Sequence, residues 1–239
     1  MERVQKVISE AGVSSRRGAE KLIREGKVLI NGEVASIGDK VSGNDEIIVD
    51  GKKVKREEKE DYLLNKPRGV ICSRSDKEGR KVITDLIDTN TRIYPVGRLD
   101  YDTTGAIILT NDGELTNILE HPKNEVERTY YAKVCGFFSK DECKMLEKGI
   151  TVDGKFCKAY HVRLKKYDKK TDKSYVSLTL KEGHNHEVKN LFKELKHPVD
   201  KLKRESFAGL YISSLNSGDY KKLNIKEVKR LYSLKKVDN

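Results

Sequence analysis

The segment 51–61 constrains the fold most, because nine of its eleven residues are charged. A stretch this polar cannot bury enough apolar surface to belong to a hydrophobic core, and it is typical of an exposed linker. We therefore expect a small N-terminal domain over residues 1–50, a charged linker over residues 51–61 and a larger domain over residues 62–239. The larger part is long enough to bury a core of its own without disulfides or metal ions.

The first 50 residues carry local signals for two helices followed by short strands. Apolar residues recur at helical spacing over residues 2–12. A second helix is predicted to follow, with Ser14 or Ser15 as its N-cap and Glu25 at its end. The Asn-Gly pair at 31–32 sits between short β-prone segments and indicates a tight hairpin turn.

The larger part has a mixed pattern that favours the α+β class. Strands and helices do not alternate regularly, which argues against a doubly wound parallel sheet. Neither a phosphate-binding loop nor a dinucleotide fingerprint occurs, so no nucleotide cofactor is predicted. Predicted strands cover residues 62–64, 106–109, 129–134, 159–165 and 175–180, and predicted helices cover residues 114–119, 140–148, 186–195 and 226–234.

The positive charge of the chain is concentrated at its C-terminal end. The formal net charge is +11, and residues 161–239 alone carry 20 basic against 10 acidic residues. A field of this kind suits a polyanion such as RNA, through phosphate contacts and counterion release. The alternative is a surface that has become rich in lysine without binding any polyanion.

Two further observations bear on the compartment. The longest apolar run, residues 106–109, is too short to cross a bilayer, and residues 1–5 lack the pattern of a secretory signal. The four cysteines include no Cys-x-x-Cys pair, which disfavours a zinc ribbon and fits a reducing environment. We expect a cytoplasmic protein without a membrane segment.

The stretch 95–113 contains the groups best suited to chemistry. A loop with two carboxylates, Asp100 and Asp102, one arginine, Arg98, and two hydroxyls, Thr103 and Thr104, leads into the apolar run 106–109. From the residue types alone two interpretations remain open. The loop is either catalytic or a capped surface loop with an Arg–Asp pair.

The order and spacing of several segments resemble a known family. Gly-Arg-Leu-Asp-Tyr-Asp-Thr-Thr-Gly at 97–105, followed by Leu-Thr-Asn-Asp-Gly at 109–113, strongly resembles the catalytic motif of RNA pseudouridine synthases of the RsuA/RluB family. Residues 2–50, through their segments 12–17 and 19–28, resemble an S4-type RNA-binding domain, and residues 62–70 are similar to the first motif of the synthase domain. The resemblance covers almost the whole chain and is closest to the RluB-like branch that acts on 23S rRNA.

The resemblance implies isomerisation of a uridine in ribosomal RNA by a synthase domain built on a mixed, mainly antiparallel sheet with flanking helices. Because this reaction imports no group and changes no oxidation state, no cofactor and no metal is expected. Asp100 matches the catalytic nucleophile. Lys189, in the motif at 181–189, matches the cation that keeps it ionised, and Tyr130 matches the active-site tyrosine. Without the resemblance, Lys189 would be a surface lysine and Tyr130 a core aromatic.

The remaining implied contacts concern RNA. Arg98, Val188, Thr103 and Thr104 are expected beside the substrate uridine, and the two hydroxyls can orient Asp100 or simply cap the loop. RNA-binding residues expected in the N-terminal domain are Arg3, Lys6, Arg16, Arg17, Lys21, Arg24 and Lys27. His184 and His186 stand where basic residues are often found, and their spacing without further ligands argues against a metal site.

Three questions stay open at the level of sequence. The target is 23S rRNA or, alternatively, 16S rRNA, as free RNA or in a pre-ribosomal particle. A rival of another class is a non-catalytic RNA-binding assembly factor on the same fold. A monomer is favoured.

Overall fold

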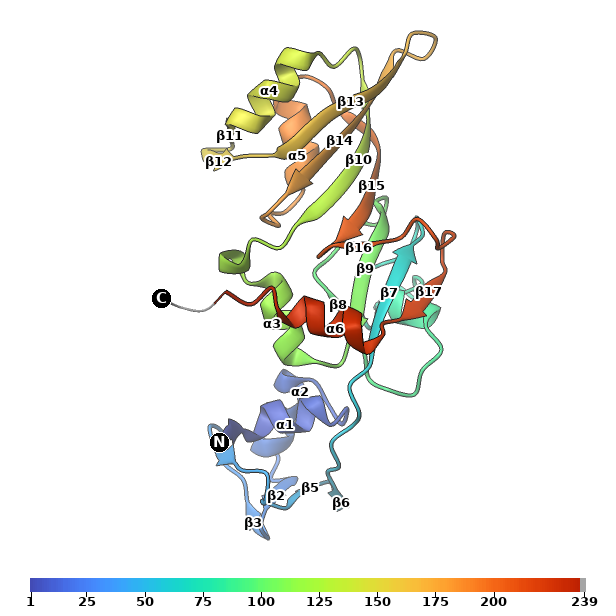
Figure 1. Cartoon of the computed structure of the whole chain (residues 1–239). Helices are drawn as coiled ribbons and strands as arrows, with labels where there is room; N and C mark the ends of the chain where they lie inside the picture. Colours follow the sequence, from blue (N-terminus) through green and yellow to red (C-terminus); the bar gives the residue numbers. More distant parts are fainter. Residues whose placement is uncertain (237–239) are drawn as a thin grey trace. The chain divides into compact units, whose positions relative to one another are not determined.

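The computed structural model describes residues 1–236, which fall into two compact units (Figure 1). The first unit contains residues 1–60 together with the short segments 89–93 and 111–113. The second contains residues 61–88, 94–110 and the chain from residue 114 onward. In the described part of the chain, no helix combines the length and the apolar composition that a membrane crossing requires.

The N-terminal unit consists of two short helices and small sheets. Ser15 caps the second helix, its hydroxyl accepting the backbone N–H of Gly18 at 3.0 Å, as one of the two predicted caps requires. Val4, Ile8 and Val28 are fully buried between helices and strands. Its elements are β1 (Glu2–Arg3), α1 (Val4–Glu10), α2 (Arg16–Arg24), β2 (Val28–Ile30), β3 (Glu33–Val34), β4 (Lys40–Val41), β5 (Ile47–Val49) and β6 (Lys52–Lys53).

The charged segment 51–61 was expected to be a linker throughout, but part of it forms a strand. Lys52 and Lys53 form β6, which pairs with β5 in the sheet order β3-β2-β5-β6. The backbone can pair here because strand hydrogen bonds use main-chain groups, while the lysine side chains stay exposed. At the other end of the segment, Asp61 already begins the first strand of the second unit.

The second unit is built around one mixed sheet with the strand order β13-β14-β10-β15-β9-β7-β17. Neighbouring strands are antiparallel except β15 and β9, which run parallel. Its strands are β7 (Asp61–Lys66), β8 (Tyr94–Val96), β9 (Thr104–Thr110), β10 (Arg128–Cys135), β11 (Ile150–Val152), β12 (Lys155–Cys157), β13 (Tyr160–Asp168), β14 (Lys173–Leu180), β15 (Val199–Phe207), β16 (Leu210–Tyr211) and β17 (Tyr220–Lys222). Its helices are α3 (Gly113–Glu120), α4 (Lys140–Lys148), α5 (Glu187–Glu194) and α6 (Ile225–Tyr232), with 3₁₀ turns at Ile83–Leu86 and Pro122–Asn124.

The strand β15 was absent from the sequence-based expectation although it lies in the middle of the sheet. It pairs antiparallel with β10 and parallel with β9, so it joins the two halves of the unit. Its residues alternate between buried Leu202 and Arg204 and exposed Lys201 and Lys203. Because one face is open and charged, the segment lacks the apolar run that marks a central strand.

Helices cover the sheet and bury its core. Leu63, Ile108 and Leu115 form one fully buried cluster with α3 and α6. At the other end of the sheet, α4 and α5 lie on one side of β13, β14, β10 and β15 (Figure 1). Phe192 of α5 and Phe138 are fully buried there, with ring centroids 5.3 Å apart. The expected α+β class with a mixed, mainly antiparallel sheet is confirmed.

Candidate active site

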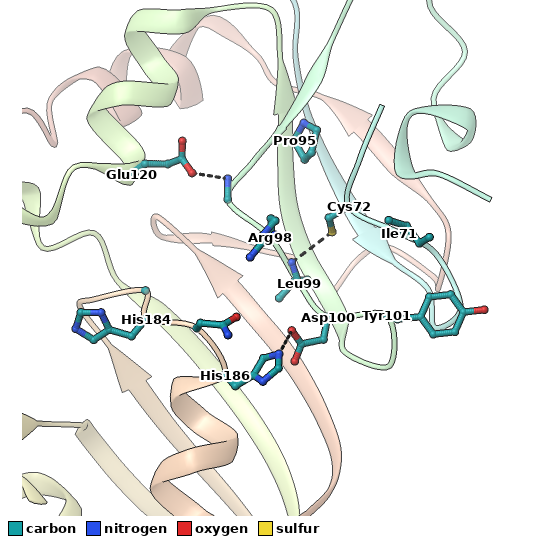
Figure 2. Close-up of a pocket in the computed structure, with 13 residues that line it drawn as sticks. Ile71, Cys72, Pro95, Arg98, Leu99, Asp100, Tyr101, Glu120, His184 and His186 are labelled. Atoms are coloured by element: carbon teal, nitrogen blue, oxygen red, sulfur yellow. Dashed lines mark hydrogen bonds and ion pairs between the residues drawn. The ribbon is translucent and has the colours of Figure 1, made fainter. Parts of the chain in front are cut away.

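The predicted nucleophile Asp100 lies on the loop between β8 and β9, at the edge of a cavity of about 670 Å³ (Figure 2). The loop is tied down on two sides. Glu120 accepts the backbone N–H of Gly97 at 3.1 Å, and the thiol of Cys72 accepts that of Leu99 at 3.3 Å. Where the loop enters β9, Gly105 has φ +113°, and a Cβ there would lie 2.1 Å from the backbone oxygen of Arg204. Only glycine fits this close approach of β9 and β15.

Each carboxylate oxygen of Asp100 has a basic partner from the start of α5. The ammonium of Lys189 lies 2.7 Å from Oδ2 of Asp100. Nε2 of His186 lies 3.2 Å from Oδ1 (Figure 2). His186 is the N-cap of α5 in the left-handed conformation, with φ 53°, which turns the chain into the helix. The predicted pairing of Asp100 with Lys189 is therefore present as a contact.

Lys189 is shared between two carboxylates, which sequence reasoning did not anticipate. Its ammonium also donates to Oδ1 of Asp102 at 2.8 Å. Partial burial works against its charge, but the hydrogen bonds to Asp100 and Asp102 raise the pKa of Lys189 above its ordinary value. The same hydrogen bond lowers the pKa of Asp102. Lys189 thus stays a cation throughout the neutral pH range.

The buried Lys66, which the sequence analysis did not identify, holds the backbone of the Asp100 loop. Lys66, at the end of β7, is fully buried. Its ammonium donates to the carbonyls of Thr103 at 2.9 Å, Asp100 at 3.1 Å and Pro67 at 3.2 Å. Burial lowers the pKa of Lys66. Its position directly before Pro67, in the segment that resembles the first synthase motif, was the available signal.

Two adjacent tyrosines on β10 point to opposite faces of the sheet, as expected from strand geometry. Tyr130 is buried and lines a pocket of about 60 Å³ together with Asp100, Val188 and Lys189. Tyr131 is half-buried on the other face, where its ring packs 6.0 Å from that of Tyr175. Only Tyr130 is therefore close to the carboxylate of Asp100.

The two threonines of the loop do not orient Asp100 through their side chains. Thr103 lines the pocket beside Tyr130, but its buried hydroxyl has no hydrogen-bond partner within residues 1–236. The hydroxyl of Thr104 donates to the carbonyl of Leu202 at 3.4 Å. The carbonyl of Thr103, rather than its hydroxyl, helps to position the loop, because it accepts a hydrogen bond from Lys66.

The other predicted substrate residues surround the same space. Arg98 is exposed and lines the large cavity together with His184 and His186. His184 is paired with Glu182 at 2.6 Å, and its backbone N–H donates to Glu187 at 3.0 Å. In the described part of the chain no group of His, Cys, Asp and Glu residues is arranged to hold a metal ion.

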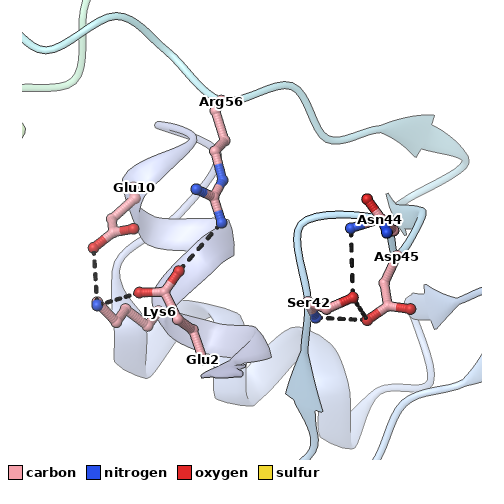
Figure 3. Close-up of polar contacts among 7 residues, drawn as sticks. All are labelled: Glu2, Lys6, Glu10, Ser42, Asn44, Asp45 and Arg56. Carbon is pink, nitrogen blue, oxygen red and sulfur yellow. Dashed lines mark hydrogen bonds and ion pairs between the residues drawn. The ribbon is translucent and has the colours of Figure 1, made fainter.

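The RNA-binding residues predicted in the first unit differ in availability. Arg3, Arg16, Arg17, Lys21, Arg24 and Lys27 are exposed. Lys6 is half-buried and lies between the carboxylates of Glu2 and Glu10 (Figure 3), while the exposed Lys21 and Lys27 both pair with Glu25. Glu10 lies one turn from Lys6 in α1, whereas Glu2 precedes the helix in β1, and both carboxylates engage Lys6 within the protein.

Known families match both parts of the chain. A family model described as RNA pseudouridylate synthase matches residues 62–194, and an S4 domain model matches residues 2–47. The ribosomal large subunit pseudouridine synthase B of Bacillus subtilis is 51% identical over 98% of this chain and 97% of its own length. An uncharacterized RNA pseudouridine synthase of Aquifex aeolicus is 41% identical over 96% of this chain and 93% of its own.

A solved structure agrees with these matches. The crystal structure of a pseudouridylate synthase superimposes with a TM-score of 0.67 and 31% identity, and it covers 97% of this chain and 100% of its own. The two family models lie in the order in which the two units follow one another in the chain. This protein therefore belongs to the RNA pseudouridine synthase family and carries an S4 domain ahead of its synthase domain.

Proposed function

We propose that this enzyme converts a specific uridine of 23S ribosomal RNA to pseudouridine in the cytoplasm. The observation that carries the chemistry is the carboxylate of Asp100, which faces a cavity while Lys189 and His186 hold its two oxygens. The choice of ribosomal RNA is supported by relatives named ribosomal large subunit pseudouridine synthase B in Bacillus subtilis and Pseudomonas aeruginosa. The S4 domain and the net charge of +11 fit an RNA substrate.

The reaction breaks the bond between N1 of uracil and C1′ of ribose, rotates the base and joins C5 to C1′. The proton on C5 is lost and N1 gains one, so the atoms balance without a co-reactant. In our proposal Asp100 acts as the nucleophile on the base or the sugar, or stabilises the sugar as the base leaves. Lys189 places a cation 2.7 Å from this carboxylate, where it can offset the negative charge that the reaction uses.

The pocket around Asp100 supplies the remaining functions. The base must leave the RNA stack to reach a carboxylate inside a pocket, and stacking on an aromatic ring stabilises an extruded base. Tyr130 offers that ring together with a hydroxyl that can move a proton. Val188 provides an apolar contact, while Arg98 at the rim can hold a phosphate or fill the space that the base leaves.

The proposed function is tested by mapping pseudouridines in ribosomal RNA from cells with and without this protein. A single site in 23S rRNA that disappears with the gene and returns with purified protein acting on a 23S transcript is the expected result. A site in 16S rRNA would retain the chemistry and change the target. Unchanged rRNA together with failed ribosome assembly would favour a non-catalytic assembly factor.

Removal of one hydroxyl from each β10 tyrosine should separate their roles. Tyr130→Phe is expected to slow single-turnover pseudouridine formation on the order of 10²-fold, the scale of a lost proton-transfer group. Tyr131→Phe should stay within about twofold, because its hydroxyl lies on the opposite face of the strand. A Tyr130→Phe protein that is as active as Tyr131→Phe, both within about twofold of the native protein, would show that the hydroxyl of Tyr130 has no part in the reaction.

The arginines at the start of α2 should contribute affinity without chemistry. Arg16 and Arg17 are the first residues of the helix, where free backbone N–H groups also favour phosphate. Arg16→Ala with Arg17→Ala should weaken binding to 23S rRNA on the order of tenfold and reduce the salt slope by about 2. Filter binding over a salt series measures both. Lys40→Ala with Lys53→Ala, which removes two charges from the same unit, serves as the control, and equal slopes for both pairs would contradict this assignment.

A further inference from the structure

The sheet of the second unit has one face that the helices α4 and α5 leave open. These helices lie on one side of β13, β14, β10 and β15 (Figure 1). Ala132, Val176 and Leu178 on these strands are fully buried, so we assign them to the side that the helices cover. Strand alternation sends the intervening residues to the other side. Cross-strand pairing then gives the order of residues on the open side. One row contains Arg163, Ser177, Tyr131 and Lys203, and the next contains Lys166, Tyr175, Lys133 and Lys201. Tyr160 pairs with Thr179 nearer the other end of these strands.

Tyrosine rings and lysine ammonium groups interleave on this open side. The ring of Tyr175 packs 6.0 Å from that of Tyr131, and the ammonium groups of Lys133 and Lys166 lie 5.9 and 6.0 Å from its centroid. Near the other end of the same strands, Lys181 lies 4.7 Å and Lys158 5.2 Å from the ring of Tyr160.

The charge of this face is largely uncompensated. Within residues 1–236, Arg163, Lys166, Lys201 and Lys203 make no ion pair with a carboxylate, and all four are exposed. Acidic groups nearby include Asp200, which pairs with Lys133 at 3.1 Å and also feels the charge of Lys201, and Asp168, which feels the charge of Lys166. Burial and the charge of Glu205 raise the pKa of Tyr131. A cluster of like charges without partners is costly unless an anion binds to it.

We propose that this open face, defined by Tyr160, Tyr175, Arg163, Lys166, Lys201 and Lys203, is an RNA-binding surface separate from the Asp100 cavity and holds RNA that flanks the target uridine. The proposal rests on the proposed function only in taking RNA as the substrate. Lysine and arginine neutralise phosphates, and the open part of a half-buried tyrosine ring, as at Tyr160 and Tyr175, can stack on an unpaired base. Sheets that bind single-stranded RNA use both means. Tyr130 and Tyr131, adjacent on β10, then face the reaction and this surface respectively.

The charges of this face are tested by a triple variant, Lys166→Ser, Lys201→Ser and Lys203→Ser. Its matched control is Lys140→Ser, Lys144→Ser and Lys148→Ser, which removes three exposed lysines from α4 on the other side of the sheet. Filter binding to a 23S rRNA transcript over a salt series should show affinity weakened on the order of tenfold and a salt slope reduced by about 2 to 3 in the test variant alone. Single-turnover experiments should show the loss in KM, with kcat at saturating RNA retained.

The aromatic contribution is tested by Tyr175→Ala against Tyr175→Phe. Loss of the ring should weaken binding about tenfold, whereas loss of the hydroxyl alone should not, because stacking uses the ring. Test and control lysine variants with the same affinity and salt slope would overturn the proposal. So would unchanged affinity for free rRNA combined with weaker binding to a pre-ribosomal particle, which would assign the face to a ribosomal protein. These binding measurements do not depend on turnover, so failure of wild-type protein to form pseudouridine would count against the proposed function alone.

Discussion

Asp100→Asn is expected to reduce single-turnover pseudouridine formation at least about 10³-fold while RNA affinity stays near that of the native protein. The substitution keeps the shape of the side chain and removes the carboxylate that we assign as nucleophile. Affinity should persist because phosphate contacts elsewhere dominate it. A single-turnover assay on 23S rRNA measures the first quantity and filter binding measures the second.

Asp102→Asn is the matched control for this prediction, because it makes the same chemical change two positions along the same loop. Asp102 contacts Lys189 at 2.8 Å but is not placed as the nucleophile. We expect a loss on the order of tenfold, since Lys189 would keep its contact with Asp100 and lose only its second partner. Substantial pseudouridine formation by a pure Asp100→Asn protein would remove Asp100 from the mechanism.

Lys189→Met should have the next largest effect, a fall in turnover on the order of 10²- to 10³-fold. The methionine keeps most of the side-chain volume beside Tyr130 and removes the cation that lies between Asp100 and Asp102. Without Lys189, Asp102 loses the hydrogen bond that lowers its pKa, so it is protonated more readily in acid. Activity of this variant should therefore rise with pH through the acidic range, because higher pH restores the ionised form of Asp102.

The native protein should not show that rise to the same extent. Its Lys189 has a raised pKa, so the cation is present at all pH values below that pKa and is lost only under alkaline conditions. Asp102 has a lowered pKa, so its contact with Lys189 is lost only as the pH falls into the acidic range. Pseudouridine formation measured between about pH 5 and pH 9 compares the two proteins, and a fully active Lys189→Met protein would contradict the assignment.

Sequence motifs predicted which residues belong to the candidate site, but not all of the contacts that these residues make. The resemblance of residues 97–105 and 181–189 to synthase motifs placed Asp100 and Lys189 together, and the structure has them 2.7 Å apart. It did not predict that Asp102 shares the same ammonium. Contacts of this kind depend on the path of the loop after Asp100, which Lys66 sets through the carbonyl groups of Asp100 and Thr103.

For the threonine hydroxyls, the sequence allowed contacts with Asp100 that the structure does not contain. Residue type made Thr103 and Thr104 reasonable partners for a carboxylate. In the folded chain Thr104 is the first residue of β9, and its hydroxyl donates to the carbonyl of Leu202. The neighbouring strand β15 determines that contact, and β15 itself was not predicted because its open face is charged.

The sequence by itself determined the elements whose signals lie within a few residues of one another. The cap of Ser15 on α2, the turn at Asn31 and Gly32 and the alternation that separates Tyr130 from Tyr131 are properties of short segments. Hydrogen bonds and backbone preferences between near neighbours produce them, so they can be predicted without knowledge of the fold.

Only the tertiary structure decided which distant side chains meet. Lys189 and Asp102 are 87 positions apart, and Lys66 reaches a carbonyl 37 positions away. The open face of Tyr175 and Lys203 likewise arises from strands far apart in the chain. Strand order and register set these contacts, and both result from burial of the whole core rather than from any local pattern.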